Sequence, residues 1–158
     1  MGVSGSGKTT VAKQLAADID GEFLDADDFH SDSARQQMAQ GKPLTDEQRA
    51  PWLARMIAYL NSNTLNNKVY VLAYSGLKRG HRQLFRELRF PAKMVMLSVS
   101  KELVELRIKQ RADHFFNAEL LSSQFDALEF PEDGEPITLV DASQSVDALV
   151  FSITRLLD

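Results

Sequence analysis

The sequence predicts an α/β fold in which helices cover both faces of a parallel β-sheet. Three observations lead to it: short apolar runs alternate with helical patterns, these runs have the length of strands, and a glycine-rich loop directly precedes the first helical pattern. With 158 residues and no recognisable linker, the chain is expected to form a single domain over residues 1–158.

Composition and charge narrow the classes of function. The chain carries a formal net charge of -4, which argues against broad nucleic-acid or anionic-membrane binding, since such proteins usually present a basic face. It has no cysteine, so disulfides and thiolate metal sites are excluded and a reducing compartment is expected. Neither a signal peptide nor a membrane span is recognisable. We therefore expect a cytoplasmic protein with no nucleic-acid or membrane partner.

The first element is a glycine-rich loop followed by a helical pattern. It fills every defined position of the pattern G-x-x-x-x-G-K-[ST], in the order Gly2-Val3-Ser4-Gly5-Ser6-Gly7-Lys8-Thr9. These residues are expected to bind ATP, because consecutive backbone N–H groups and a helix N-terminus cradle phosphates. Lys8 would act on the β- and γ-phosphates and the Thr9 hydroxyl would bind Mg²⁺. A chance turn rich in glycine and serine is the weaker alternative, since an amphipathic helix follows.

The second element is a strand expected at residues 22–27. Asp25 and Asp27 come two apart at its carboxyl end, so both side chains are expected on one side, at the edge where ligands bind in such sheets. One carboxylate can hold the hydration shell of Mg²⁺ while the other accepts a proton from an attacking hydroxyl group. An acidic junction with an aspartate as helix cap is the alternative. Asp28 is interpreted as a solvated neighbour.

The connection to the next strand is unusually long. About 40 residues separate the two strands, which favours an inserted helical substrate cap, at residues 31–67, over a structureless loop. Within it, Thr45-Asp46-Glu47-Gln48 predicts a capping box, and Pro51 suits the first turn of the helix in "PWLARMIAYL".

Basic residues follow the strand expected at residues 68–75, again at a carboxyl end. Lys78, Arg79, His81 and Arg82 concentrate positive charge where an anionic substrate could be held. The alternative is a basic first turn of an exposed helix, which is the favoured interpretation of Arg79.

Two further strands are expected at residues 93–100 and 137–142. Between them, Arg107 and Arg111 stand four residues apart on one helix face. A mobile helix that presents two guanidinium groups can close over a transferring phosphoryl group and neutralise its charge. We therefore expect a lid at residues 107–118, with both arginines catalytic. Salt bridges at the surface are the alternative.

The histidines do not predict a metal site. His30, His81 and His114 lack a shared ligand spacing. His114 with Phe115 and Phe116 is interpreted as a lid hinge or an apolar anchor of the lid. Together, the elements predict a three-layer P-loop NTPase fold with a parallel sheet, a helical substrate cap and a lid.

The chain resembles the gluconokinases, a family of small P-loop kinases related to the shikimate kinases. The resemblance spans nearly the whole chain, and its most specific parts are the segments around Trp52 and from His114 to Glu135. The matching segments are "GVSGSGKT", "FLDADDFH", "GKPLTDEQRAPWL", "SGLKR" with Arg82, and "HFFNAELLSSQFDALEFPEDGE".

The resemblance implies an activity and a setting for it. It implies ATP-dependent phosphorylation of the 6-hydroxyl of D-gluconate, with Mg²⁺ as cofactor, on a sheet of five parallel strands, in a protein that is usually a homodimer. The ATP contacts would run from Gly2 to Thr9. By analogy with shikimate kinases, Asp25 would lie near Mg²⁺ and Asp27, the expected base, near the acceptor hydroxyl.

The resemblance also implies roles for the basic residues. Arg107 and Arg111 match the lid arginines, and Lys78 and Arg82 match basic positions that would hold the substrate anion. We count His30, in "FLDADDFH", with the residues that bind substrate. Two alternatives remain: a kinase for a related sugar acid or polyol, and a nucleotide-binding protein without kinase activity.

The start of the chain raises a separate expectation. Members of the family carry a short apolar strand directly before the loop, at the centre of the sheet between the strands that begin here near Lys68 and Lys93. Met1 resembles the last residue of that strand. From the usual length of strands, we expect roughly five to ten more apolar residues before Met1 in the native gene product.

Overall fold

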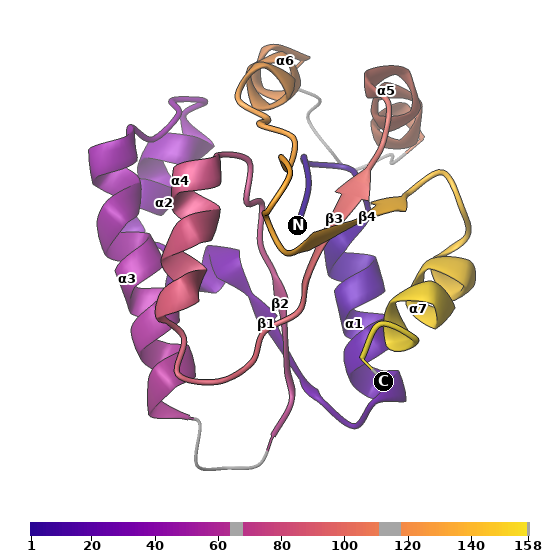
Figure 1. Ribbon diagram of the computed structural model, residues 1–158. Helices are drawn as coiled ribbons and strands as arrows, with labels where there is room; N and C mark the ends of the chain where they lie inside the picture. Colours follow the sequence, from indigo (N-terminus) through magenta and orange to yellow (C-terminus); the bar gives the residue numbers. More distant parts are fainter. Residues whose placement is uncertain (64–67, 111–117, 158) are drawn as a thin grey trace.

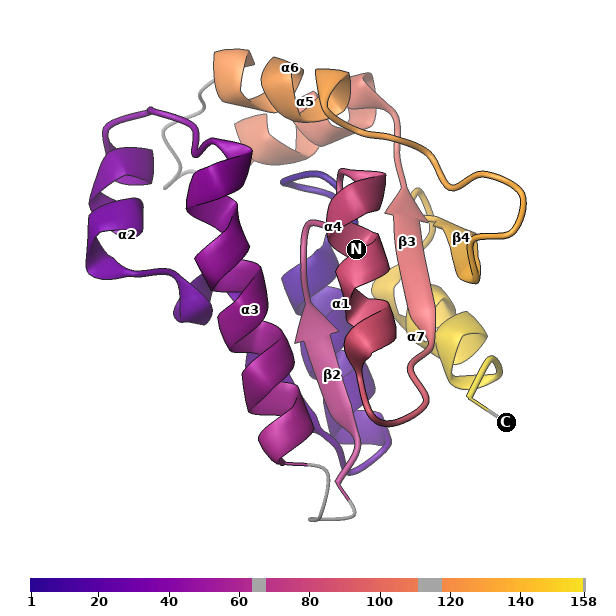
Figure 2. The same cartoon turned by 60° about the vertical axis from the view of Figure 1, so that its left-hand side comes forward.

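The computed structural model describes residues 1–63, 68–110 and 118–157. Figure 1 shows three layers, with the strands in the middle, α1 and α7 on one side, and α3 and α4 on the other. Helices α5 and α6 lie together beyond the carboxyl end of β3, as the turned view in Figure 2 also shows. The elements in chain order are α1 (Lys8–Asp18), β1 (Glu22–Asp25), the 3₁₀ helix η1 (Ala26–Phe29), α2 (Asp32–Ala39), α3 (Asp46–Ser62), β2 (Tyr70–Ala73), α4 (Arg79–Gln83), the 3₁₀ helix η3 (Leu84–Glu87), β3 (Met94–Ser98), α5 (Lys101–Lys109), α6 (Ala118–Asp126), β4 (Ile137–Asp141) and α7 (Val146–Thr154).

The strands pair in parallel, as predicted. Strand β1 pairs with β2, and β3 with β4, so the part of the chain that the structure describes forms two two-stranded sheets. The backbone of Met1 and Gly2 lies between them. The Met1 amino group donates to the Val95 carbonyl at 2.6 Å, Leu97 N–H donates to the Met1 carbonyl at 2.9 Å, and Gly2 N–H donates to the Ser75 carbonyl at 2.9 Å. The resemblance implied one five-stranded sheet; here these backbone contacts join two smaller ones.

Two apolar clusters, one on each side of the strands, form most of the core. The cluster between the strands and helices α1 and α7 consists of Val11, Leu15, Leu97, Ala142, Leu149, Val150 and Ile153. The cluster on the side of α3 consists of Ala26, Trp52, Leu53, Met56, Leu60, Tyr74 and Phe85. Along β2, Val71 packs against the first cluster and Leu72 against the second, which is the alternation expected of a strand buried on both faces.

The long connection between β1 and β2 is helical, as expected. It contains α2 and α3, and the predicted capping box starts α3: Thr45 Oγ1 accepts from Gln48 N–H at 3.3 Å, while Gln48 Oε1 accepts from Thr45 N–H at 2.9 Å. Because this box starts the helix at Asp46, the prediction that Pro51 lies in the first turn is wrong. Pro51 lies inside α3.

The strand predicted at residues 22–27 ends earlier, at Asp25. Asp25 Oδ1 accepts a hydrogen bond from Asp27 N–H at 3.0 Å, and this cap turns the chain into η1. Strand alternation therefore does not place Asp27, although both carboxylates still face one cavity. None of the helices in residues 1–63, 68–110 and 118–157 combines the length and the apolar character needed to cross a membrane.

Candidate active site

The phosphate loop leads from Met1 into α1, and its glycines set its shape. Gly5 has φ 77° and Gly7 has φ 98°, both in the left-handed region that favours glycine. At Gly5 there is also no room for a side chain, since a Cβ would lie 2.8 Å from Cγ1 of Val104 on α5. Gly7 is the N-cap of α1, so the free N–H groups of this helix begin at the loop. The loop is thus held between α1 and α5.

Lys8 reaches back across this loop. Its Nζ donates to the Val3 carbonyl at 2.8 Å. Burial lowers the pKa of Lys8 to about 8, and the carboxylates of Asp27 and Asp25 oppose this shift. A partly dehydrated ammonium group therefore stands between the loop and the two carboxylates, where its charge acts strongly on a nearby phosphate.

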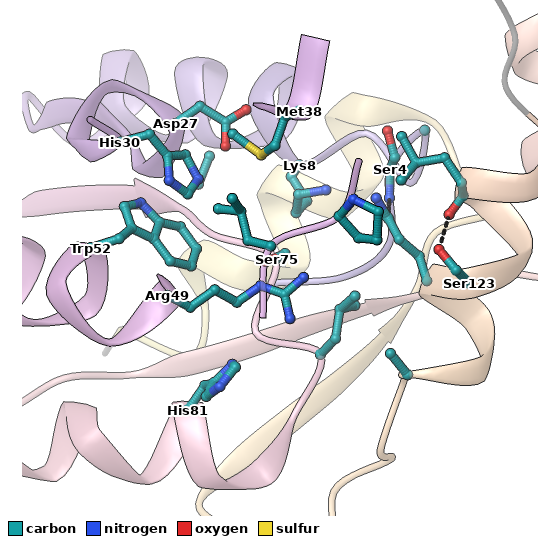
Figure 3. A pocket seen from close by; sticks show the side chains of 18 of the residues that line it. Ser4, Lys8, Asp27, His30, Met38, Arg49, Trp52, Ser75, His81 and Ser123 are labelled. Carbon is teal, nitrogen blue, oxygen red and sulfur yellow. Dashed lines mark hydrogen bonds between the residues drawn. The ribbon is translucent and has the colours of Figure 1, made fainter. Parts of the chain in front are cut away.

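The loop opens into a cavity of about 500 Å³. Its walls come from the loop and α1, the end of β1, the α2–α3 turn, the start of α3, the segment after β2, and α6 (Figure 3). The predicted site residues that line it are Ser4, Gly5, Gly7, Lys8, Thr9, Asp25, Asp27, His30 and Lys78. Three other loop residues, Gly2, Val3 and Ser6, are not part of its wall, and Val3 and Ser6 are buried behind it.

The two carboxylates are not equivalent. Asp25 uses one oxygen to cap η1, as described above, and lines the cavity beside Thr9. The Asp27 side chain is reached by solvent from the cavity, yet protein surrounds it enough to raise its pKa, and the neighbouring carboxylate of Asp25 raises it further. A raised pKa strengthens the ionised Asp27 carboxylate as a proton acceptor.

An aromatic wall stands next to Asp27. The rings of His30 and Trp52 stack with centroids 4.3 Å apart and an angle of 13° between their planes. Trp52 is fixed by a hydrogen bond of 2.6 Å from its Nε1 to the Ala26 carbonyl. Burial lowers the pKa of His30, so its imidazole is uncharged at neutral pH. This wall gives the cavity a flat, largely apolar side beside the carboxylates.

Basic side chains that line the cavity gather around one acidic residue, Asp46. Asp46 accepts from Lys78 Nζ at 2.7 Å, and it lies 3.4 Å from His81 Nε2 and 3.5 Å from Arg49 Nη1. Figure 3 shows the Arg49 side chain extending into the pocket, with Trp52 and His81 on either side. Asp46 thereby draws the start of α3 and the segment after β2 together around two cations, Arg49 and Lys78, and the His81 imidazole, whose pKa is lowered by burial.

Sequence reasoning missed Arg49, Trp52 and Gln124 as residues of this site. Arg49 and Trp52 are three residues apart on α3, a spacing that puts both on one helix face and could have suggested a shared surface. Gln124 lies on α6 and gave no comparable signal.

Arg82 corrects a prediction. It was expected to hold the substrate anion, but its side chain is 1% exposed and does not line the cavity. It donates to Glu135 through Nε (3.2 Å) and Nη2 (2.8 Å), and Nη1 donates to the carbonyls of Gly76, Leu77 and Glu129 at 2.8–3.0 Å. Arg82 therefore belongs to the framework behind the site, where it joins the segment after β2 to the segment after α6.

Arg82→Met is expected to lower the free energy of unfolding by about 3 kcal/mol, because the carbonyls of Gly76, Leu77 and Glu129 lose their guanidinium donor and Glu135 keeps only its longer contact with Arg79, at 3.4 Å. Thermal and urea unfolding would measure this. Arg86→Met is the matched control: Arg86 is exposed on η3, and a change there should stay within about 0.5 kcal/mol. Equal stability of the two variants would contradict the assignment of Arg82 to the framework.

Of the two predicted lid arginines, the structure describes Arg107 but not Arg111. Arg107, near the end of α5, donates from Nη2 to the Ala142 carbonyl at 2.6 Å and is not among the residues that line the cavity. Arg111 and the segment 114–116 lie outside the described residues. A closing motion over the transferred group therefore stays a prediction for both arginines.

Known proteins are similar to this chain over most of its length. The family described as AAA domain matches residues 1–131. A probable gluconokinase from Dictyostelium discoideum is 39% identical over 163 residues, covering 97% of this chain and 82% of that protein. The chain belongs to the gluconokinase family. A gluconokinase from Gluconobacter oxydans is 37% identical over 155 residues, covering 98% of this chain and 87% of its own. The crystal structure of a gluconokinase from Sinorhizobium meliloti aligns with a TM-score of 0.87 at 33% identity, covering 99% of this chain and 90% of that one.

Membership of the gluconokinase family confirms the resemblance seen in the sequence and the predicted P-loop kinase fold.

Proposed function

We propose that this protein transfers the γ-phosphoryl group of ATP to the 6-hydroxyl of D-gluconate and forms 6-phospho-D-gluconate and ADP. One observation carries the proposal: a single cavity joins a phosphate loop, a carboxylate pair and a set of cations. A kinase whose acceptor carries both hydroxyl groups and a negative charge needs these three parts. The gluconokinases to which the chain is similar support the choice of acceptor.

The residues of the loop fit ATP with Mg²⁺. The loop and the start of α1 present backbone N–H groups and the Lys8 ammonium group, both suited to phosphate oxygens. The Thr9 hydroxyl and the free oxygen of Asp25 are the hard oxygen ligands that Mg²⁺ takes, and Mg²⁺ usually completes its shell with waters and phosphates. When bound, the ion would neutralise charge on the β- and γ-phosphates.

Asp27 is proposed as the base. It would accept the proton of the 6-hydroxyl as the oxygen of that group forms its bond to phosphorus, while ADP leaves. Lys8 would hold the phosphates in line and oppose their growing charge. The Arg107 and Arg111 guanidinium groups are proposed to join them when the lid segment closes.

The carboxylate at the other end of gluconate is proposed to bind Arg49 and Lys78. Arg49 offers a planar fork of N–H donors that matches a carboxylate, and its contact with Asp46, at 3.5 Å, leaves most of these donors free. Asp46 would keep Lys78 in place through their hydrogen bond of 2.7 Å. His30 is proposed to line the path of the sugar chain with Trp52.

Arg49→Gln is expected to raise the KM for gluconate by roughly 10- to 100-fold, because a hydrogen bond to a charged group contributes about 1.5–3 kcal/mol. The KM for ATP should change little, since Arg49 belongs to α3, whereas the phosphates are assigned to the loop and the start of α1. Steady-state kinetics with each substrate varied in turn would measure both. Arg86→Gln serves as the control. An unchanged KM for gluconate in Arg49→Gln would rule out this contact.

The reaction itself is tested by an assay coupled to ADP release over a panel of acceptors: gluconate, related sugar acids and polyols, shikimate and nucleoside monophosphates. Gluconate is expected to give the highest kcat/KM. Faster turnover of another acceptor would reassign the substrate. Binding of nucleotide without turnover of any acceptor would favour a nucleotide-binding protein instead.

The resemblance supports two further parts of the proposal, a homodimer and a cytoplasmic location. The lack of cysteine in the 158-residue sequence agrees with a reducing compartment.

A further inference from the structure

Helix α6 touches the phosphate loop through one polar side chain. Gln124 Oε1 accepts a hydrogen bond from the backbone N–H of Ser4 at 2.6 Å, although the two residues are 120 positions apart in the chain. Both residues line the cavity. Figure 3 shows Ser4 and Ser123, the residue before Gln124, at the same end of the pocket. An uncharged amide from another helix therefore uses a donor of the loop that would bind phosphate.

This contact is held in place by the packing around it. Leu121, three residues before Gln124 and thus on the same face of α6, is 3% exposed and packs in one cluster with Val3 and Val104. Val3 therefore packs against Leu121, and the next loop residue, Ser4, bonds to Gln124 one turn further along the same face of α6. A hydrogen bond of 3.1 Å from Lys101 Nζ to Ser122 Oγ ties α6 to α5.

The far end of α6 is fixed as well. Glu129 N–H donates to the Leu77 carbonyl at 2.9 Å, and the Arg82 guanidinium group donates to the Glu129 carbonyl at 2.8 Å. The side chain of Gln124 is thus delivered to Ser4 by a helix anchored on both sides.

The Ser4 N–H has a single proton to donate. In the structure Gln124 accepts it, so a phosphate oxygen at the same N–H has to displace the amide oxygen or share the proton at a loss to both. Glutamine and nucleotide phosphate are in this sense competitors for one donor. A charged phosphate oxygen is the stronger acceptor and displaces the amide oxygen. The affinity of the loop for phosphate is nevertheless reduced, because the hydrogen bond between Ser4 and Gln124 is lost.

We propose that Gln124 is an internal competitor of the nucleotide phosphates, which weakens their binding and takes over the Ser4 N–H as the product ADP leaves. The proposal rests on the nucleotide site of the proposed function and adds to it a residue that sets phosphate affinity. Gln124 needs no contact with the acceptor for this role. Gln124 should therefore change the Kd of the nucleotide, by the same factor with and without gluconate.

The test is the dissociation constant of the nucleotide in two variants. Gln124→Met keeps the length of the side chain and removes the acceptor, so the Kd for ADP should fall by roughly two- to tenfold, the range for a neutral hydrogen bond. Gln124→Glu places a carboxylate at Ser4 that accepts more strongly and repels phosphate, so the Kd should rise by more than the methionine variant lowers it. Isothermal titration calorimetry measures both.

Two further ligands locate the effect at phosphate. Inorganic tripolyphosphate should show the same order of Kd values as ADP, whereas adenosine, which has no phosphate, should bind all variants alike. Gln14→Met is the matched control, because Gln14 lies on the exposed side of α1 and its amide donates to Asp18 at 2.8 Å. Stopped-flow release of a fluorescent ADP analogue should be slower from Gln124→Met than from the wild type.

The outcomes separate this inference from the proposed function. If Gln124→Met binds ADP as weakly as the wild type, or more weakly, while the wild type phosphorylates gluconate, the competitor role is overturned and the function stands. If the wild type binds neither ADP nor tripolyphosphate, both are overturned.

Discussion

Lys8→Met is expected to lower kcat on the order of 10²–10³-fold, by comparison with the loss of one donor at a charged transition state. The Lys8 ammonium group is partly dehydrated, and it stands between the loop and the carboxylates, where the charge of the leaving phosphates develops. Its contact strengthens as the γ-phosphoryl group departs, so the loss should fall on kcat more than on the KM for ATP. Steady-state kinetics with saturating gluconate would measure it.

The same residue predicts a pH dependence. Since burial lowers the pKa of Lys8 to about 8, the free protein loses this charge as pH rises through about 8, and kcat/KM for ATP should fall there. Lys13→Met, on the same helix, is the control: Lys13 is exposed and stands 5.3 Å from the centre of the Phe23 ring, away from the cavity. A kcat of Lys8→Met close to that of Lys13→Met would remove Lys8 from the mechanism.

The residues that sequence reasoning placed in the cavity share one property. Lys8, Asp25 and Asp27 belong to short segments whose local pattern already decides their position: a loop that begins a helix, and the end of a strand. The predicted position of Asp27 in the cavity is correct although β1 is shorter than predicted, because the cap by Asp25 keeps Asp27 at the same edge of the sheet.

Other residues depend on partners that are distant in sequence. Arg82 looked like a residue for the substrate anion because it follows a strand end, but Glu135, 53 positions later, takes its guanidinium group into the core. Conversely, Arg49 resembled one more charge on an amphipathic helix until packing placed it beside the Asp46 cluster. Local patterns carry no information on which of two arginines will meet a buried carboxylate, because that choice is made by tertiary packing.

Asp27→Asn is expected to lower kcat on the order of 10²–10⁴-fold, the range for the loss of a general base. The amide has nearly the shape of the carboxylate but does not accept the proton of the 6-hydroxyl. ATP binding should be spared or slightly stronger, because the substitution removes a negative charge near the phosphates. Calorimetry with an ATP analogue and single-turnover kinetics would separate binding from transfer.

The pH profile gives a second, independent reading of this role. Burial and the Asp25 carboxylate raise the pKa of Asp27, so the fraction of ionised base falls as pH drops through a pKa higher than the ordinary value of aspartate. The kcat/KM of the wild type should decline there, and this acidic limb should be absent from the residual activity of Asp27→Asn. Asp28→Asn, at the exposed neighbouring position, should keep both the rate and the limb. Near-normal kcat in Asp27→Asn, or the same limb in both variants, would mean that another group accepts the proton.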